Sequence, residues 1–514
     1  MPLRPFAPKL PASAWAVIAF LLLLVSLSND SIDMMESQTW DYARHDTFAG
    51  FYRELHTDSA PESQMPLGMF SFWAWSRGFG TGELAMRSLN LVWAAIALAA
   101  LARVGRLLSI PWLPILFAIQ PFVWYYMNYA RSPLMQMAGG ALMLAGALGY
   151  VRRINPDSLG GILLCLGAIL LSGTNMFGIV PMVAVAVGLT GLGVWNRLHL
   201  PLKGKILAFT TAIIVAVFVA YYLLIQLRGS GGSQLWTVSP ANVLFAAFEY
   251  LGLQGLGPGR QELRAIMKGL VSSREILPFL PGLIVLCAAY LVIFGAAFKS
   301  WMTREPSRPT SVSAIPPASP GRAFLLISPW MMGLGVPALS ALLLYVLATA
   351  SGMAFWGRHL AGAFPFWVLA LGITIHWARQ GIWRKTGRLA VLAVLLLLMC
   401  SSLLIRFAPW HKHDDYRRAV AEAVRISSGG GIVWWVADHS GGAYYGLPLA
   451  ETITGAPGEI QFSMNRQEIP EQLPAAIVLS RLDNFDTKGD VRRILAAGSY
   501  KKTRTLQTFE IWEK

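Results

Sequence analysis

Charged residues are scarce in this sequence. Only 13% of the 514 residues are Asp, Glu, Lys or Arg, whereas 55% are hydrophobic. A soluble domain usually carries about 25% charged residues, so the composition excludes an ordinary soluble enzyme. Several apolar runs approach the roughly 20 residues that are needed to cross the hydrocarbon core of a bilayer. The composition therefore predicts a polytopic α-helical membrane protein.

Cysteine is rare, and the common catalytic motifs are lacking. The three cysteines, Cys165, Cys287 and Cys400, lie in separate apolar runs, which excludes a disulfide framework and a cysteine-based metal site. Free cysteines in such runs behave as small buried hydrophobes. The chain has no H-E-x-x-H, C-x-x-C, phosphate-loop or G-x-S-x-G pattern in a fitting context. We expect no tightly bound cofactor, assign no metal ligand and leave the use of a divalent metal open.

Eleven apolar runs are predicted to span the membrane. Their approximate cores are 12–28, 84–102, 111–127, 133–150, 159–173, 175–195, 205–227, 276–298, 324–349, 359–378 and 389–406. The first run is followed by no clear A-x-A cleavage site, so we interpret it as a retained span and not as a signal peptide. The shorter apolar segment 66–79 is predicted to be an interfacial helix.

Basic residues are distributed unevenly between these spans. With a cytoplasmic N-terminus, every cytoplasmic piece carries at least two Lys or Arg, whereas the short outer connections carry few. This pattern follows the positive-inside rule and explains most of the net charge of +15 without a nucleic-acid partner. The long outer loop 228–275, with five basic residues, is the exception. We expect a multi-pass protein of the bacterial inner membrane whose C-terminus is extracytoplasmic.

The last hundred residues differ in character from the rest. Short apolar runs at 431–437 and 475–480 are typical of buried strands, 500–514 alternates like a strand pair, and two helices are predicted between His411 and the C-terminus. We predict an extracytoplasmic α/β domain over 411–514, with Trp434 and Trp435 in its core and not in a sugar platform. Residues 1–410 form the predicted transmembrane domain. It includes a first outer loop with interfacial helices (29–82) and a cytoplasmic linker rich in Pro and Ser (299–322).

The first outer loop is acidic although the chain as a whole is basic. Residues 29–65 contain eight acids and two arginines. A carboxylate just outside a span can act as a general base on an acceptor hydroxyl. Arginines at the same depth can hold a phosphate by bidentate hydrogen bonds, and a cation near the hydrocarbon usually has a partner or a task. Together these features predict transfer of a group from a lipid-linked phosphate at the outer interface.

Four stretches make the chain resemble the integral-membrane GT-C glycosyltransferases, in particular their family 39-like branch. They are the acidic first loop and the segments "DSAPESQMPLGMFSFWAWSRGFGTGELAMRSLN", "PFVWYYMNYARSPL" and "FWGRHLAGAFPFWVLALG". That branch includes protein mannosyltransferases and lipid A aminoarabinose transferases. The resemblance implies a polyprenyl-phosphate sugar donor, membrane lipid as surroundings, and one inverting displacement onto a hydroxyl of a protein, lipid or glycan acceptor. We expect a role in cell-envelope or exopolysaccharide glycosylation.

The resemblance also implies roles for individual residues. Asp33 or Glu36 stands near the position of the family's Asp-Glu pair and would be the catalytic base, with Asp33 slightly favoured. The donor phosphate would be bound by basic residues near the ends of spans: Arg87, Arg131, Arg358 and His359. The donor or acceptor pocket would be lined by residues of the second and third stretches: Asp58, Gln64, Pro66 and Tyr129. Tyr129 stands where the family commonly has a glutamate, so one carboxylate that could assist a metal or an acceptor is absent.

Other interpretations stay open. The two candidate bases could simply be solvated or begin a helix. Arg87 could pair with Glu83 one helical turn away, and Arg131, Arg358 and His359 could anchor the chain among lipid headgroups. The alternative functions are a transporter or flippase for a lipid-linked saccharide and a polysaccharide polymerase outside the GT-C class. Transporters often show internal repeats and ionisable residues at mid-span, and neither feature is visible in this sequence.

Overall fold

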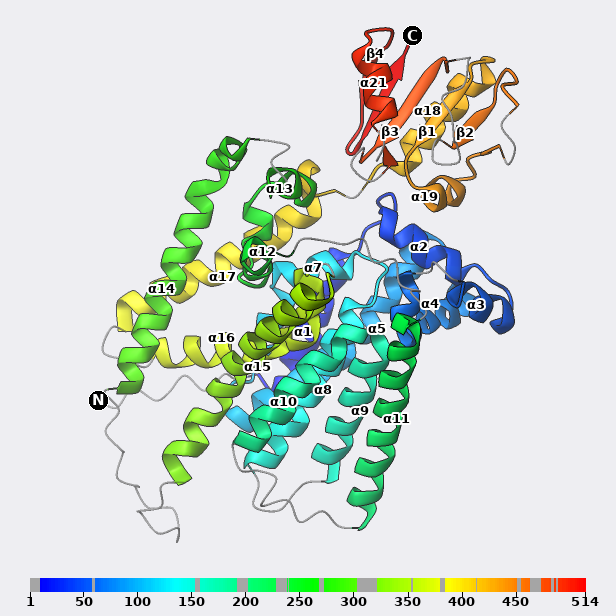
Figure 1. Cartoon of the computed structure of the whole chain (residues 1–514). Coiled ribbons are helices and arrows are strands. Elements are labelled where there is room, and N and C mark those ends of the chain that lie inside the picture. The colour runs from blue at the N-terminus through cyan, green and yellow to red at the C-terminus, as the bar shows by residue number, and fades with distance from the viewer. Residues whose placement is uncertain are drawn as a thin grey trace.

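A bundle of helices lies beneath a small α/β domain (Figure 1). The computed structural model describes residues 10–57, 61–152, 158–191, 202–227, 238, 240–267, 272–302, 321–352, 355–379, 384–412, 414–450, 454–462, 473–481, 485–486 and 489–514. We call the end of the bundle next to the α/β domain its upper end, and the α/β domain the C-terminal domain. The predicted linker 299–322 falls mostly on residues outside this set.

Helices occupy all eleven predicted spans. They are α1 (Ala12–Ser26), α5 (Glu83–Leu108), α6 (Leu113–Ala118), α7 (Pro121–Met127), α8 (Pro133–Arg152), α9 (Ser158–Thr174), α10 (Ile179–Gly191), α11 (Leu202–Leu227), α14 (Leu280–Met302), α15 (Gly321–Ser351), α16 (Phe364–Ala378) and α17 (Arg384–Phe407). Six described helices are long and apolar enough to cross a membrane, and four shorter apolar helices accompany them. The predicted polytopic helical architecture is confirmed.

The predicted run 111–127 is not one helix but two. It divides into α6 and α7, with Gln120 in an extended conformation between them. Pro121 explains the break, because proline has no amide hydrogen for α6 to continue and it disfavours helical geometry in the residue before it. After this break, the short helix α7 and the loop 128–132 that follows it are buried at the upper end of the bundle.

The first loop is itself helical. It contains α2 (Met34–Ala43), α3 (Phe48–Leu55), the short 3₁₀ helix η1 (Pro61–Gln64) and α4 (Pro66–Phe79). The segment predicted as an interfacial helix is therefore helical, with the expected bounds. Phe48, Tyr52 and Phe70 expose a third or more of their surfaces there, as is typical of aromatic side chains at a membrane interface.

A buried ion pair holds the start of this loop. The guanidinium of Arg87 on α5 donates from Nε to Glu36 Oε1 at 2.9 Å and from Nη2 to Glu36 Oε2 at 2.7 Å. Its remaining N–H groups donate to the carbonyls of Ser28, Asp30 and Ser31. The exposed fractions of the two side chains are 0% and 1%. One side chain therefore ties the residues after α1 and the first turn of α2 to α5.

The long loop between α11 and α14 contributes short helices to the upper end. They are α12 (Pro240–Tyr250), η4 (Gln254–Leu256), α13 (Arg260–Met267) and η5 (Ser273–Phe279). The late helix α16 is preceded by the 3₁₀ helix η6 (Gly357–Ala363). Tyr250 and Phe364 pack edge to face, with ring centroids 5.1 Å apart, so α12 and the η6–α16 junction lie against each other.

The C-terminal domain is a five-stranded sheet with three described helices. Its elements are α18 (Tyr416–Ser428), β1 (Val433–Val436), α19 (His439–Tyr444), β2 (Ile460–Phe462), β3 (Ala476–Ser480), α21 (Asp490–Ala496), β4 (Lys501–Thr505) and β5 (Phe509–Glu513). The strand order is β2-β1-β3-β5-β4, with β1 parallel to β2 and β3, and β5 antiparallel to β3 and β4. Trp434 and Trp435 are buried on opposite faces of the sheet, which agrees with their predicted place in the core.

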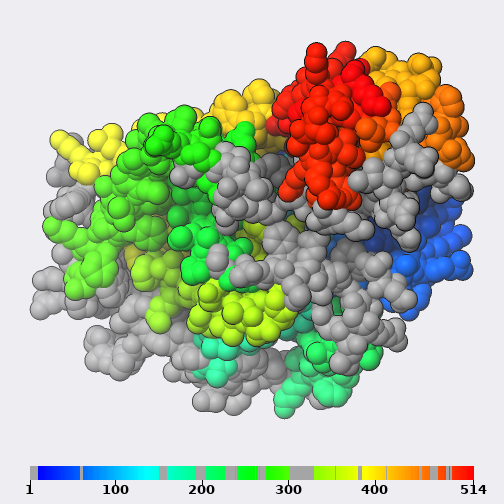
Figure 2. Space-filling model, turned by 45° about the horizontal axis from the view of Figure 1, so that its top comes forward, coloured from blue at the N-terminus to red at the C-terminus, as the bar shows by residue number. Residues whose placement is uncertain are grey.

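This domain docks on the first loop. Helix α19 lies directly beside α2 (Figure 1), and the space-filling view shows the domain, from orange to red, above the blue surface of the first loop (Figure 2). Ser37 on α2 donates to Asp438 Oδ2 at 2.9 Å, and Ser440 donates to Asp41. The interface therefore places acidic side chains of both partners close together.

The Arg87 pair gives a first prediction. Replacing Arg87 by Met leaves the buried Glu36 carboxylate without its counter-charge, which should lower the free energy of unfolding by about 3–5 kcal/mol. Equilibrium unfolding in detergent micelles measures this change. The control is Arg425→Met, because the exposed Arg425 pairs with Glu422 at the surface and such pairs contribute little. Equal stability of the two variants would contradict the assigned role.

The docking interface gives a prediction on pH. Burial, and to a lesser extent Asp41, raise the pKa of Asp438 to about 6. The folded protein therefore binds this proton more tightly than the unfolded chain does. The stability that protonated Asp438 adds is present at acidic pH and is lost as the pH rises through about 6. Asp438→Asn keeps an acceptor oxygen without the charge. Its melting temperature in detergent should exceed that of the wild type at pH 7.5, and the difference should shrink by pH 5. A difference that does not change with pH would refute this.

Candidate active site

Asp33 lies at the upper end of the bundle, immediately before α2, and only 6% of its surface is exposed. Its extended backbone and its side chain cap the helix, since Oδ1 accepts a hydrogen bond from Met35 N at 2.8 Å. Oδ1 also accepts from the Tyr129 hydroxyl at 3.1 Å, and Oδ2 accepts from Arg481 Nη2 at 3.1 Å. The carboxylate thus meets the loop after α7 on one side and the C-terminal domain on the other.

Glu36, the other candidate base, is hydrogen-bonded through both carboxylate oxygens. In addition to its two hydrogen bonds with Arg87, it accepts from Asp33 N at 2.9 Å and from Ala130 N at 2.7 Å. These four bonds fill the lone-pair sites of a carboxylate. No lone pair of Glu36 is left for a substrate hydroxyl, which argues against Glu36 as the base.

Arg87 does not suit its expected phosphate-binding role either. Its five N–H groups all donate to Glu36 or to backbone carbonyls, which exhausts the donors of a guanidinium. The alternative pairing with Glu83 is also wrong, because Glu83 accepts from Arg417 of the C-terminal domain at 2.7 Å. The charges within the predicted helix could not reveal the partner of Arg87, because Glu36 lies 51 residues away in the sequence.

Arg131 is buried beneath α2 and is not exposed to a headgroup region. Its Nη1 donates to Glu62 Oε1 at 3.1 Å and to Met35 O at 3.1 Å. The Tyr42 hydroxyl donates to the other oxygen of Glu62 at 3.4 Å. Glu62 was one of the eight acids of the first loop, and sequence reasoning gave it no role. Its place four residues before Pro66, inside one of the family-like stretches, is the signal that could have identified it.

Arg260 and Glu249 were also missed. Arg260 Nη2 lies 3.2 Å from Glu249 Oε1, and its guanidinium stacks over Tyr125 at 4.8 Å from the ring centroid. Burial alone would lower the pKa of Arg260, but Glu249 and the neighbouring tyrosines raise it well above its ordinary value. The residue is therefore a permanent cation. The signal for it was present in the sequence, since the basic residues of loop 228–275 depart from the positive-inside rule.

Arg358 is the third guanidinium of this region. It lies in η6, just before α16, within electrostatic range of Tyr129, Arg131 and Arg260. Its Nε lies 3.5 Å from Nε2 of His359, whose ring stacks on Phe177. Among the described residues, none offers Arg358 a carboxylate within ion-pair distance, whereas Arg131 has Glu62 and Arg260 has Glu249. This guanidinium is the one best placed to receive an added anion.

Gly357 allows η6 to lie this close to α12. A Cβ atom at Gly357 would overlap the carboxylate of Glu249, whose side chain is buried. A residue with a side chain fits here only if the buried, ion-paired Glu249 carboxylate moves. The sequence "FWGRHL" thus combines a close approach of backbone with a guanidinium directly after it.

The remaining predicted pocket residues are spread along the first loop and α7. Tyr129 joins the cluster through its bond to Asp33. Pro66 is the first residue of α4, where its missing amide hydrogen costs nothing, and Gln64 ends η1. Asp58 lies outside the described residues. Of these four predicted pocket residues, Tyr129 is the one that the structure places against Asp33 and within electrostatic range of Arg358.

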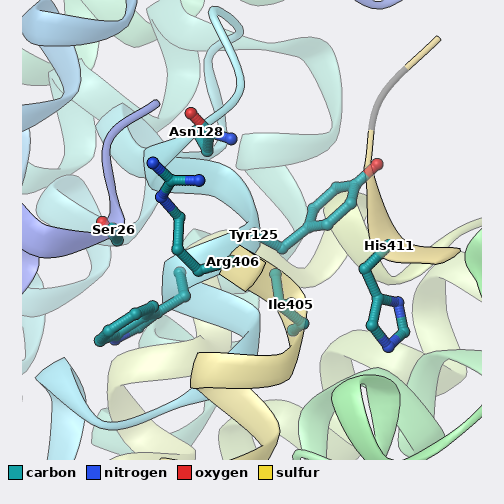
Figure 3. Close-up of a pocket in the computed structure, with 7 residues that line it drawn as sticks. Ser26, Tyr125, Asn128, Ile405, Arg406 and His411 are labelled. Atoms are coloured by element: carbon teal, nitrogen blue, oxygen red, sulfur yellow. The ribbon is translucent and has the colours of Figure 1, made fainter. Parts of the chain in front are cut away.

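A small pocket opens beside the cluster, between the upper ends of α1, α7 and α17 (Figure 3). Its lining residues are Ser26, Trp124, Tyr125, Asn128, Ile405, Arg406 and His411. The Arg260 guanidinium lies over the ring of Tyr125, one of the lining residues. Burial lowers the pKa of His411 to about 4, so its ring is neutral at physiological pH. None of the four predicted pocket residues is among those that line this space.

The described residues contain no group of three or more His, Cys, Asp or Glu side chains that could hold a metal ion. Sequence comparisons add no assignment: no family model matches the chain, and no curated protein matches it significantly. The solved structures are more informative.

ArnT from Cupriavidus metallidurans bound to undecaprenyl phosphate aligns with 97% of this chain and 97% of its own, at 12% identity and a TM-score of 0.50. The fold of the chain is similar to that of ArnT. This likeness confirms the predicted GT-C-like fold, with its helical bundle and small C-terminal domain. Apo ArnT aligns over the same shares at 13% identity and a TM-score of 0.48. Arabinofuranosyltransferase AftD from Mycobacteria aligns at 13% identity and a TM-score of 0.35, over 83% of this chain and 29% of that chain.

The close approach at Gly357 yields a prediction. Gly357→Ala forces η6 away from Glu249, and overpacking of this kind should lower stability by about 1–3 kcal/mol. The matched control is Gly335→Ala in α15, where an added Cβ meets no atom within 4 Å and alanine favours the helix. Unfolding of both variants in detergent provides the comparison. If Gly357→Ala proves as stable as Gly335→Ala, η6 and α12 are not packed as described.

Proposed function

We propose that the protein is a membrane glycosyltransferase that moves a sugar from a polyprenyl-phosphate donor to an acceptor hydroxyl on the extracytoplasmic face. One observation carries the proposal. Arg358, a guanidinium without a carboxylate partner among the described residues, lies within electrostatic range of Tyr129, which donates a hydrogen bond to Asp33. A cation for a phosphate and a carboxylate for a hydroxyl proton are thus found at one end of the bundle.

The reaction follows from these two groups. Asp33 accepts the proton of the acceptor hydroxyl while the oxygen attacks the anomeric carbon. The bond from that carbon to the phosphate oxygen breaks in the same step, so the configuration inverts and polyprenyl phosphate leaves as an anion. The Arg358 guanidinium stabilises the charge of the leaving phosphate. Arg260, whose guanidinium lies over the ring of Tyr125, adds positive potential to this region.

The likeness to ArnT supports the choice of donor. That protein was solved with undecaprenyl phosphate bound. The present chain shares its fold, and the guanidiniums of Arg131 and Arg260 lie within electrostatic range of Arg358 at the upper end of its bundle. We further propose that this end faces the periplasm of a bacterial inner membrane. The acceptor is a protein, a lipid or a growing glycan of the cell envelope or of an exopolysaccharide.

Transfer assays test the proposal. The purified protein is incubated with labelled polyprenyl-phosphate hexoses or pentoses and an envelope extract as the source of acceptor. Asp33→Asn should lower the transfer rate about 100-fold or more, because a general base contributes roughly 10²–10⁴-fold. Arg358→Ala should weaken both donor binding and turnover, and Arg358→Lys should restore only part of the loss, since an ammonium cannot form the bidentate contact.

The control for these variants is Arg425→Ala, which removes an exposed charge far from Asp33 and should transfer at the wild-type rate. Transfer that survives Asp33→Asn would remove the proposed base. Movement of the labelled donor across proteoliposomes without its consumption would instead favour a flippase.

A further inference from the structure

Arg481 is a residue of the C-terminal domain that reaches the proposed catalytic loop. It follows β3 directly, and its φ angle of 50° lies in the left-handed region. Such a conformation is strained for any residue with a Cβ and is readily adopted by glycine. An arginine at this position implies that its side chain makes a contact that a glycine could not.

That contact is a bridge between two carboxylates. Nη2 of Arg481 lies 3.1 Å from Asp33 Oδ2 and 2.7 Å from Asp414 Oδ2. Asp33 belongs to the start of α2, whereas Asp414 immediately precedes α18 of the C-terminal domain. The exposed fractions of the three side chains are 11% for Arg481, 9% for Asp33 and 1% for Asp414. Asp414 Oδ2 also accepts from Met34 N at 3.2 Å, which brings the two acids to the same turn of α2.

We propose that Arg481 is a positioning residue for the transfer reaction: from the C-terminal domain, it holds Asp33 in place and ionised by standing between Asp33 and Asp414. This inference rests on the proposed function, in which Asp33 is the base. It makes the C-terminal domain part of the catalytic machinery, because the cation that neutralises the two acids comes from that domain.

The physical reason is the proximity of two buried acids. Without a cation, neighbouring buried carboxylates share a proton, because both cannot be ionised at low cost. Burial raises the pKa of Asp414 above its ordinary range, the Arg481 guanidinium opposes this, and the charge of Asp33 adds to the rise. If Asp33 held this shared proton, it could not accept the proton of the acceptor hydroxyl.

Other groups face Asp33 and have to be considered. The Tyr129 hydroxyl donates to Oδ1, and Tyr416 of α18 lies within electrostatic range. Glu36 approaches the backbone nitrogen of Asp33, and its charge is neutralised by Arg87. The tyrosines are neutral at physiological pH. Asp438, immediately before α19, also lies within electrostatic range of Arg481, but Arg481 contacts Asp33 and Asp414 directly. We therefore expect the protonation of Asp33 to depend chiefly on Arg481 and Asp414.

Docking of the domain can be separated from this effect. Arg417, also in the C-terminal domain, pairs with Glu83 of α5 at 2.7 Å and donates to Asn29 O at 3.2 Å. It holds the same two parts of the chain together without a described contact to Asp33. Arg417→Gln is therefore a matched control for a loss of docking.

The test is the pH dependence of kcat/KM in the transfer assay. Arg481→Gln should move the acidic limb of the profile upward by about one pH unit or more, which is roughly a tenfold loss at a pH on that limb. Arg481→Lys should move it less, and Arg417→Gln should leave it in place. The double variant Arg481→Gln/Asp414→Asn should return towards the wild-type limb, because the second carboxylate is gone. If Arg481 had only a structural role, the double variant would instead lose more activity than Arg481→Gln alone.

Arg481→Gly guards against misfolding, since glycine adopts the left-handed backbone without strain and should reproduce the limb of Arg481→Gln. A spectroscopic arm needs no turnover: the infrared C=O stretch of a protonated carboxyl should appear at neutral pH in Arg481→Gly and vanish when Asp414→Asn is added. The inference is overturned if the acidic limb stays at the wild-type position in both Arg481→Gln and Arg481→Gly, or if Arg417→Gln shifts the limb equally. It is also overturned if the C=O band of a protonated carboxyl does not appear in Arg481→Gly. Wild-type transfer by Asp33→Asn would instead overturn the proposed function, whatever the Arg481 variants do.

Discussion

The buried ion pair of Arg87 and Glu36 is the contact on which the upper end of the bundle depends. Glu36 receives both N–H groups of one edge of the guanidinium and, in addition, the amides of Asp33 and Ala130. It therefore connects α5, the start of α2 and the loop between α7 and α8. Since both charges are desolvated, the pair holds only while each partner stays in place. The position of Asp33, three residues before Glu36 in the same capping box, is a direct consequence.

The buried arginines near this ion pair differ in whether they have a carboxylate partner. Arg131 is matched by Glu62, Arg260 by Glu249, and Arg481 by Asp33 together with Asp414. Arg358 lacks such a partner among the described residues. A buried cation is costly without an anion, and in the proposed function this cost is offset when the donor phosphate binds. In the proposed function, the donor completes an arrangement of charges that the protein leaves incomplete.

Part of this could be predicted from the sequence. Hydrophobic run length places the helices, because a span in lipid is set by thickness and composition, and alternation places the strands β4 and β5. The acidity of the first loop drew attention to Asp33 and Glu36, and the order of short motifs drew attention to Arg358; the roles of these residues stay predictions. The partners could not be predicted. Glu36 and Arg87 are 51 residues apart and Asp33 and Arg481 are 448 apart, and nothing in local periodicity records which side chain completes a distant charge.

The break at Pro121 shows that hydropathy alone misses what the local proline rule predicts, and the strained backbone of Arg481 shows a site where the local conformational preference is overruled. A single continuous helix over 111–127 would satisfy hydropathy, but it would carry Asn128, Tyr129 and Arg131 along its axis and away from Asp33. Likewise, a glycine after β3 would satisfy the left-handed backbone, but it would leave Asp33 and Asp414 facing each other. In both places the departure from regular structure accompanies a polar side chain that contacts the first loop. The departures from regular structure are therefore found where the two proposed catalytic elements, the loop after α7 and the C-terminal domain, meet the same carboxylate.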